Sequence, residues 1–230
     1  MKITKRQDRR VHTHTDWSKP ATDYWIVATT ADQSTVSAAT NTAGVDSFGW
    51  TATSLVHTNL VTADFFSAAD DTPNHFLANA SGDLLRSPIM FGSYAHRLLV
   101  SKILGYLPTK LCLEFYAAFT VASADEAATY IGFDNAAAMT CAVYSDATNY
   151  LLSNDGGTTE DAGGTVASVG NTFHTWKIVL DSGTSLSEWF IDDVSQGTLA
   201  IKADVWPSAF VAVASTTNRF ALAWAHVWYE

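Results

Sequence analysis

Two segments of this chain alternate their side chains with a period of two, each over about ten positions. Between residues 111 and 120, one face carries only apolar side chains: Leu111, Leu113, Phe115, Ala117 and Phe119. Between 220 and 229, the alternation places Phe220, Leu222, Trp224, His226 and Trp228 on one face and Ala221, Ala223, Ala225, Val227 and Tyr229 on the other. A period of two sustained over this length fits a β-strand and excludes a helix.

Six further segments are rich in β-branched and aromatic residues and predict strands: 24–29, 128–133, 140–144, 175–180, 188–191 and 209–214. Clusters of Asp, Asn, Gly, Ser and Thr separate them, and helix signals are scarce. The polar region 64–85 is the exception, where we expect a short helix or a long loop. The sequence therefore predicts an all-β fold, an antiparallel two-sheet β-sandwich or jelly roll.

The charge of the chain is divided unevenly between its ends. Thirteen Lys and Arg against 23 Asp and Glu give a net charge of −10. Residues 1–19 hold six basic and two acidic residues (+4), so the remaining 211 carry −14. A basic segment without apolar periodicity is typical of an arm that orders on a partner. We expect an N-terminal arm over 1–23 and one sandwich domain over 24–230, whose acidity argues against nucleic-acid binding.

The arm and the start of the first strand carry the candidate docking residues. Basic side chains would pair with acidic groups of a partner and aromatic ones would fill apolar hollows: Lys5, Arg6, Arg9, Arg10, Trp17, Tyr24 and Trp25. The alternative is a solvated tail. His12 and His14 would share one face of an extended segment, but this short match does not carry a metal site, and we predict no metal or cofactor.

Cys112 and Cys141 each lie in an apolar run, where a thiol behaves as a small apolar side chain. A disulfide between neighbouring strands is the alternative.

The acidic residues do not form a catalytic pair. On a strand, Glu188 and Asp192 would share a face at about 13 Å, whereas the two carboxyl groups of glycosidases stand about 5–9.5 Å apart. Asp192 and Asp193 instead predict the turn of a hairpin. The chain has neither a Gly-x-Ser-x-Gly elbow nor a phosphate-binding glycine loop. We predict that the protein is not an enzyme, with a divergent polysaccharide-cleaving enzyme as a rival.

Eight tryptophans are many for 230 residues. Exposed tryptophan can stack on sugar rings or anchor an interface. We expect three of them, which fall in strand patterns, to lie in the core: Trp176, Trp189 and Trp224. His174 and His226 also fall on strands, and we expect packing or surface histidines there rather than ligands.

From about residue 171 onward, the order of features resembles the concanavalin A-like lectin/glucanase family. Residues 174–181 (HTWKIVLD) look like its H-x-W/Y-x-I strand, and 188–193 (EWFIDD) look like the hairpin partner that ends in an F-x-I-D-G-type turn. Residues 225–229 (AHVWY) look like its closing strand. The resemblance implies a concanavalin A-like jelly roll. The Glu-x-Asp-x-Glu strand of the family's glucanases does not occur in this chain.

An acidic body rich in Ala and Thr behind a basic arm resembles virion proteins of tailed bacteriophages. There such sandwiches serve as capsid decoration proteins, head fibres or tail appendages. The resemblance implies a non-enzymatic virion protein, assembled in the host cytoplasm, that docks on the major capsid protein or another virion protein. It favours a homo-oligomer, with a trimer as the first expectation. The alternative is a carbohydrate-binding module of a phage tail or fibre, with a glycan as partner.

No run of residues approaches the roughly 18 apolar positions of a membrane span, and the first residues lack the apolar stretch of a signal peptide. We therefore expect no membrane partner.

Overall fold

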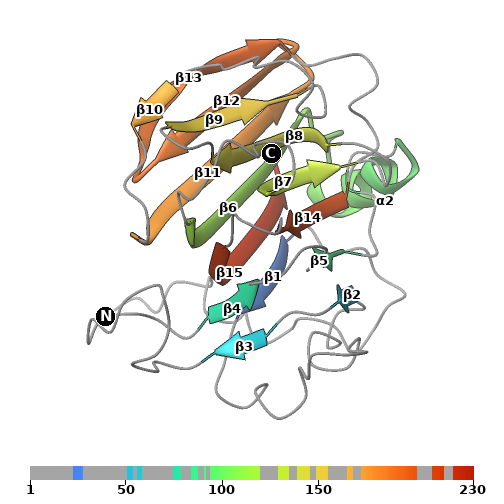
Figure 1. Ribbon diagram of the computed structural model, residues 1–230. Coiled ribbons are helices and arrows are strands. Elements are labelled where there is room, and N and C mark those ends of the chain that lie inside the picture. The colour runs from blue at the N-terminus through green and yellow to red at the C-terminus, as the bar shows by residue number, and fades with distance from the viewer. Residues whose placement is uncertain are drawn as a thin grey trace, which may run out of the picture.

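The computed structural model consists of two antiparallel β-sheets packed face to face, with a helix at one end (Figure 1). This arrangement confirms the predicted β-sandwich of the jelly-roll type. The structure describes residues 23–27, 51–53, 56–58, 75–78, 84–87, 91, 94–119, 129–134, 139–145, 149–154, 165–167, 172–200, 209–214 and 220–230.

The larger sheet has eight strands. Seven of them follow the order β13 (Val194–Ala200), β12 (Leu186–Ile191), β11 (His174–Asp181), β6 (Lys110–Phe119), β15 (Phe220–Tyr229), β4 (His75–Ala78) and β3 (Val56–Thr58). The eighth, β1 (Asp23–Val27), also pairs with β15.

The smaller sheet has seven strands. Their order is β10 (Thr165–Ala167), β9 (Asn149–Ser153), β8 (Met139–Ser145), β7 (Tyr130–Asp134), β14 (Ala209–Val213), β5 (Leu84–Arg86) and β2 (Thr51–Thr53). Thus the described residues of the region 64–85 are strands β4 and the start of β5, and the short helix or long loop expected there is wrong for them.

The core lies between the two sheets, and β6 supplies its centre. All five residues of the predicted apolar face of β6 are fully buried, as the alternation requires. Trp176 and Trp189 are also fully buried, which confirms the core position predicted for both. Trp176 stands edge-on to Tyr150 of the smaller sheet, with ring centroids 4.7 Å apart. Its indole N–H donates to the carbonyl oxygen of Ala117 at 2.9 Å.

Strand β15 contains a bulge that the sequence pattern did not reveal. Its pairing with β6 shifts register between Leu222, opposite Ala117, and Trp224, opposite Tyr116. The extra residue, Ala223, moves the following side chains to the other face. Core positions therefore pass from Phe220 and Leu222 before the bulge to Ala225, Val227 and Tyr229 after it. The uninterrupted alternation predicted for 220–229 is wrong, and so is the core position predicted for Trp224.

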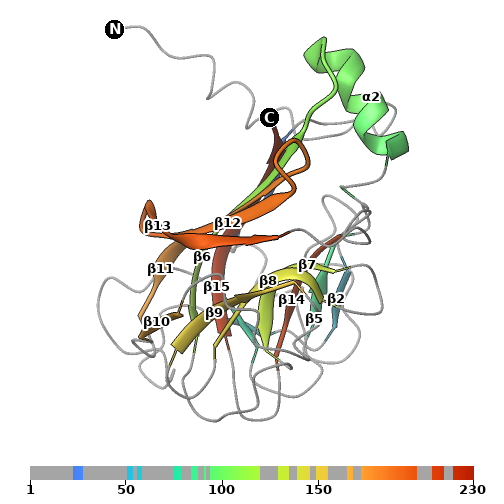
Figure 2. The same cartoon turned by 90° about the horizontal axis from the view of Figure 1, so that it is seen from above.

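Helix α2 (Tyr94–Leu104) follows β5 and projects beyond the two sheets at the end where the C-terminus lies (Figure 2). Gly105, with φ +82°, ends the helix, and its N–H donates to the carbonyl of Ser101 at 2.8 Å. The guanidinium of Arg97 donates to the carbonyl of Pro108 at 2.7 and 3.2 Å and ties the connection back to the helix. No helix of the described residues is long and apolar enough to cross a membrane.

A two-residue turn joins β12 to β13. Asp192 and Asp193 both have positive φ, at 49° and 65°, and Ile191 pairs with Val194 across them. These angles are those of a type I′ hairpin turn, which favours Asp, Asn and Gly. The turn predicted at Asp192 and Asp193 is confirmed.

Candidate binding surface

The outer face of the larger sheet carries an unusual concentration of rings. We define this outer face by seven half-buried side chains that alternate with core residues on β6, β11, β12 and the second half of β15: Glu114, Tyr116, Lys177, Phe190, Trp224, His226 and Trp228. The register makes them neighbours, because Lys177 stands opposite both Phe190 and Glu114, and His226 stands opposite Glu114.

One row of rings crosses this face near the bulge. Tyr116 lies between Phe173, just before β11, and Trp224 of β15. The ring centroids of Tyr116 and Phe173 are 5.2 Å apart. Those of Tyr116 and Trp224 are 6.3 Å apart, with the planes inclined by only 24°. The bulge at Ala223 makes this row possible, because it turns Trp224 outward.

A second row runs across the face near the C-terminus. The ammonium group of Lys177 lies 5.6 Å from the ring centroid of Phe190 and 5.4 Å from that of Trp228. A cation over ring faces at such distances is attracted by their π-electrons. Trp228 in turn stacks on His226, with centroids 4.5 Å apart and planes inclined by 23°. The indole N–H of Trp228 donates to Glu230 Oε1 at 3.0 Å, which fixes the ring.

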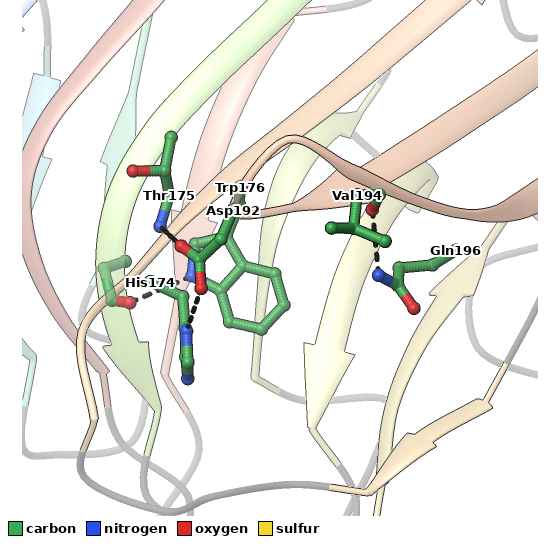
Figure 3. Close-up of polar contacts among 7 residues, drawn as sticks. His174, Thr175, Trp176, Asp192, Val194 and Gln196 are labelled. Carbon is green, nitrogen blue, oxygen red and sulfur yellow. Dashed lines mark hydrogen bonds and ion pairs between the residues drawn. The ribbon is translucent and has the colours of Figure 1, made fainter.

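The two histidines predicted on strands lie on β15 and at the start of β11. His226 belongs to the second row of rings. His174 lies at the start of β11, where its Nδ1 is 2.7 Å from Asp192 Oδ2 (Figure 3). Among the described residues, no three His, Cys, Asp or Glu side chains gather in a cluster that could hold a metal ion.

Asp192 holds the hairpin turn against the neighbouring strand. Besides the contact with His174, its Oδ1 accepts the N–H of Thr175 at 2.9 Å (Figure 3). Burial raises the pKa of Asp192, but the hydrogen bonds from His174 and Thr175 outweigh it and bring the pKa below its ordinary value. Glu188 has a separate contact and accepts the Ser195 hydroxyl at 2.6 Å. Each of the two carboxylates thus has a contact of its own within the β11–β12–β13 meander.

A charged pair on the smaller sheet connects strands across β14. The guanidinium of Arg86 in β5 donates to both carboxylate oxygens of Asp134 in β7, with 3.1 Å between Nη1 and Oδ2. Asp134 is buried. Burial, followed by the charge of Asp134, raises the pKa of the nearby Tyr130 to about 12. The Arg86–Asp134 pair therefore ties β5 to β7 across β14.

Both cysteines are free and buried. Burial is the main cause that raises the pKa of each thiol to about 12. They pack as small apolar side chains, as the sequence predicts, and the alternative disulfide is not formed.

The predicted docking residues fall mostly outside the described part of the chain. This applies to Lys5, Arg6, Arg9, Arg10 and Trp17. Tyr24 and Trp25 lie on β1, opposite Val227 and His226 of β15. The backbone of β1 therefore borders the outer face, a relation that the sequence did not predict.

No protein-family model matches the chain, and no curated protein does. Among solved structures, the chain is similar to an alginate lyase from Corynebacterium sp., with 13% identity, 74% of this chain and 83% of the lyase covered, and a TM-score of 0.46. It is similar to a mutant Trypanosoma rangeli sialidase displaying trans-sialidase activity, with 11% identity, coverage of 76% and 27%, and a TM-score of 0.50. It is also similar to the carbohydrate recognition domain of Emp46p, with 8% identity, coverage of 67% and 82%, and a TM-score of 0.45. At these identities the likeness is one of fold alone, a two-sheet β-sandwich.

Proposed function

We propose that this protein is a non-enzymatic carbohydrate-binding module, and that the outer face of the larger sheet is its binding surface. The observation that carries the proposal is the outward orientation of Trp224, His226 and Trp228, which occupy alternate positions along β15. On a strand these three alternate positions extend over about 13 Å, a length that suits several sugar units. These three side chains point away from the core because the bulge at Ala223 shifts the alternation of β15 by one residue.

The chemistry of the outer face matches that of a sugar chain. A pyranose ring presents C–H groups on its faces and hydroxyl groups around its rim. Flat indole and phenol rings offer partners for the C–H groups, while the carboxylate of Glu114 and the ammonium of Lys177 offer hydrogen bonds to the hydroxyls. The stacking of Trp228 on His226 and the cation–π contact of Lys177 with Trp228 hold the rings in place before a ligand binds. This lowers the entropic cost of binding.

The test is a broad glycan array, followed by titration calorimetry with the glycans that bind. We expect Trp228→Ala to weaken binding by about tenfold or more, as loss of a central aromatic contact does. In the calorimetric titration, which measures the affinity of a single site, Tyr106→Ala is the matched control, because Tyr106 is an exposed aromatic residue outside the outer face. The proposal is wrong if no glycan binds across broad panels, or if both variants bind as the unchanged chain does.

The same glycans also test the rival enzymatic function. Each is incubated with the protein, and the products are separated by mass. Intact glycans are expected. Shortened products that disappear with Glu188→Ala would instead support a polysaccharide-cleaving enzyme.

The uneven charge of the chain favours a second role, that of a virion surface protein. In this proposal the basic arm docks on the major capsid protein or another virion protein, and the acidic sandwich faces outward. Quantitative mass spectrometry of purified particles tests it. One copy per capsid subunit, or one third of that, would support a decoration protein. A few copies would support a tail or fibre module, and absence from particles would contradict both.

A further inference from the structure

Helix α2 and the connection after it expose an apolar ridge. We define the α2 ridge by the large apolar side chains that are 43–54% exposed there: Leu98, Leu99, Ile103, Tyr106 and Leu107. The helix attaches to the body by its other side, where Val100 is fully buried and His96 contacts Tyr229. An exposed apolar cluster of this kind marks an interaction surface.

The segment that carries the ridge is basic, although the chain as a whole is acidic. Residues 94–110 contain Arg97, Lys102 and Lys110 and no Asp or Glu, while the whole chain carries −10. Lys102 is exposed in the middle of the ridge, and no described residue forms an ion pair with it. A partner for this surface must therefore be both apolar and acidic.

The β12–β13 hairpin offers a surface of that composition. Val194 is 62% exposed, more than any other large apolar side chain of the described residues. It follows directly after the exposed carboxylates of Asp192 and Asp193, and Asp193 has no ion-pair partner within the described ranges. In the order of the larger sheet, β13 is also the terminal strand. We call Asp193 and Val194, at the start of β13, the hairpin edge.

The two surfaces lie at opposite ends of the same strands. At one end, Asp181 of β11 pairs with Lys110, close to α2. At the other, Trp176 of β11 pairs with Ile191, next to the hairpin turn. The six residues of β12 alone separate these ends by roughly 17–20 Å. Both views show α2 and β13 apart (Figures 1 and 2), so one copy cannot join its own two surfaces.

We propose that the α2 ridge of one copy docks on the hairpin edge of the next, so that copies of this chain associate head to tail. Charge complementarity points to this occupant, because Lys102 would face Asp193 while the apolar side chains of the ridge cover Val194. A symmetric pairing of two ridges would instead bring Lys102 against Lys102. Head-to-tail contacts close into rings when the rotation between copies permits. A ring of three copies would be the trimer expected from the sequence.

Light scattering coupled to gel filtration measures the mass of the protein in solution and so the number of copies that associate. We expect an oligomer for the unchanged chain, and monomers for both Ile103→Glu, which breaks the ridge, and Val194→Glu, which breaks the hairpin edge. Leu186→Glu is the matched control, because Leu186 is an exposed apolar residue outside both surfaces. It should leave the mass unchanged.

Mixing the two monomeric variants identifies the type of contact. The Ile103→Glu copy keeps an intact hairpin edge and the Val194→Glu copy keeps an intact ridge, so together they should form a dimer and nothing larger. The charge pair gives a second readout. Lys102→Glu and Asp193→Lys should each weaken association, and the double variant should restore it. A monomeric unchanged chain, or a mixture that stays monomeric, would overturn the proposal.

Discussion

At the residue scale, Gly132 shows how closely two strands of the smaller sheet approach. Gly132 pairs with Ala142, and a Cβ at this position would overlap the backbone of Ala142 and Cys141. The strand backbone is held by its hydrogen bonds and cannot move to relieve this overlap without cost. Gly132→Ala should therefore lower the free energy of unfolding by about 1–3 kcal/mol. Urea denaturation measures this against Gly183→Ala, whose methyl group would meet only the side chain of Asp181. Equal midpoints for the two variants would contradict the close approach.

Another single residue, His96, connects helix α2 to the end of β15. Its Nδ1 is 2.6 Å from the hydroxyl of Tyr229, which donates to the carbonyl of Phe91 at 2.8 Å. Burial lowers the pKa of His96 below its ordinary value of 6.5. The unfolded chain therefore takes up the proton at a higher pH than the folded one. The resulting stability is complete above pH 6.5 and is lost as the pH falls through the folded-state pKa.

We therefore expect His96→Gln to flatten the decline in the free energy of unfolding between about pH 7 and pH 5. Urea midpoints across this range provide the measurement. Tyr229→Phe is the control, because it removes the hydroxyl but leaves His96 covered. It should lower stability and keep the pH slope. A slope unchanged in His96→Gln would show that other groups cause the decline.

At the scale of elements, the bulge in β15 separates two kinds of tryptophan that the sequence treated alike. Trp176 is fully buried, so Trp176→Ala should cost about 3–5 kcal/mol of stability. Trp224 lies half-buried on the outer face, and Trp224→Ala should cost about 1 kcal/mol. Denaturation followed by far-ultraviolet circular dichroism compares them without using tryptophan fluorescence. Equal losses would mean that Trp224 belongs to the core and that β15 has no bulge.

Elements with a strong local pattern were predictable, and elements set by distant partners were not. Strand β6 alternates clearly because one face is buried from end to end. The bulge was not predictable because Ala221, Ala223 and Ala225 fit either face of a strand. The pattern therefore does not show where the register shifts. Helix α2 was not predicted because it exposes much of its apolar surface instead of burying it. The helix-stop signals Gly105 and Pro108 were nevertheless present in the sequence. Terminal strand β13 (VSQGTLA) has no buried apolar face that the pattern could reveal.

At the scale of the whole molecule, the candidate surface arises only when segments far apart in the chain become neighbours. Lys177 reaches both Phe190 and Trp228 because β12, β11, β6 and β15 are consecutive in the sheet. Sequence reasoning singled out Trp25 for docking, but it could not foresee that β1 would stand beside His226. The overall sandwich was predictable from strand patterns and turns. The composition of its outer face required the strand order and the bulge.

The division of charge over the whole molecule leads to a last prediction. Deleting residues 2–19 removes six basic and two acidic residues, so the net charge falls from −10 to −14 (−10 − 4). Strand β1 begins at Asp23, so the shortened chain keeps every described strand. We expect its thermal midpoint, its glycan affinity and the number of copies in its oligomer to stay unchanged, because the outer face, the α2 ridge and the hairpin edge all remain.

If the chain docks on capsids as proposed, binding to purified capsids should weaken by about tenfold or more without the arm, because its basic side chains would supply the attraction to acidic groups. The same attraction would make capsid binding of the full chain fall as salt is added, since dissolved ions screen charges. Cosedimentation with capsids over a range of salt concentrations measures both effects. Equal binding of the two chains at every concentration would show that residues 2–19 are a solvated tail, and the docking surface would then have to lie on the sandwich itself.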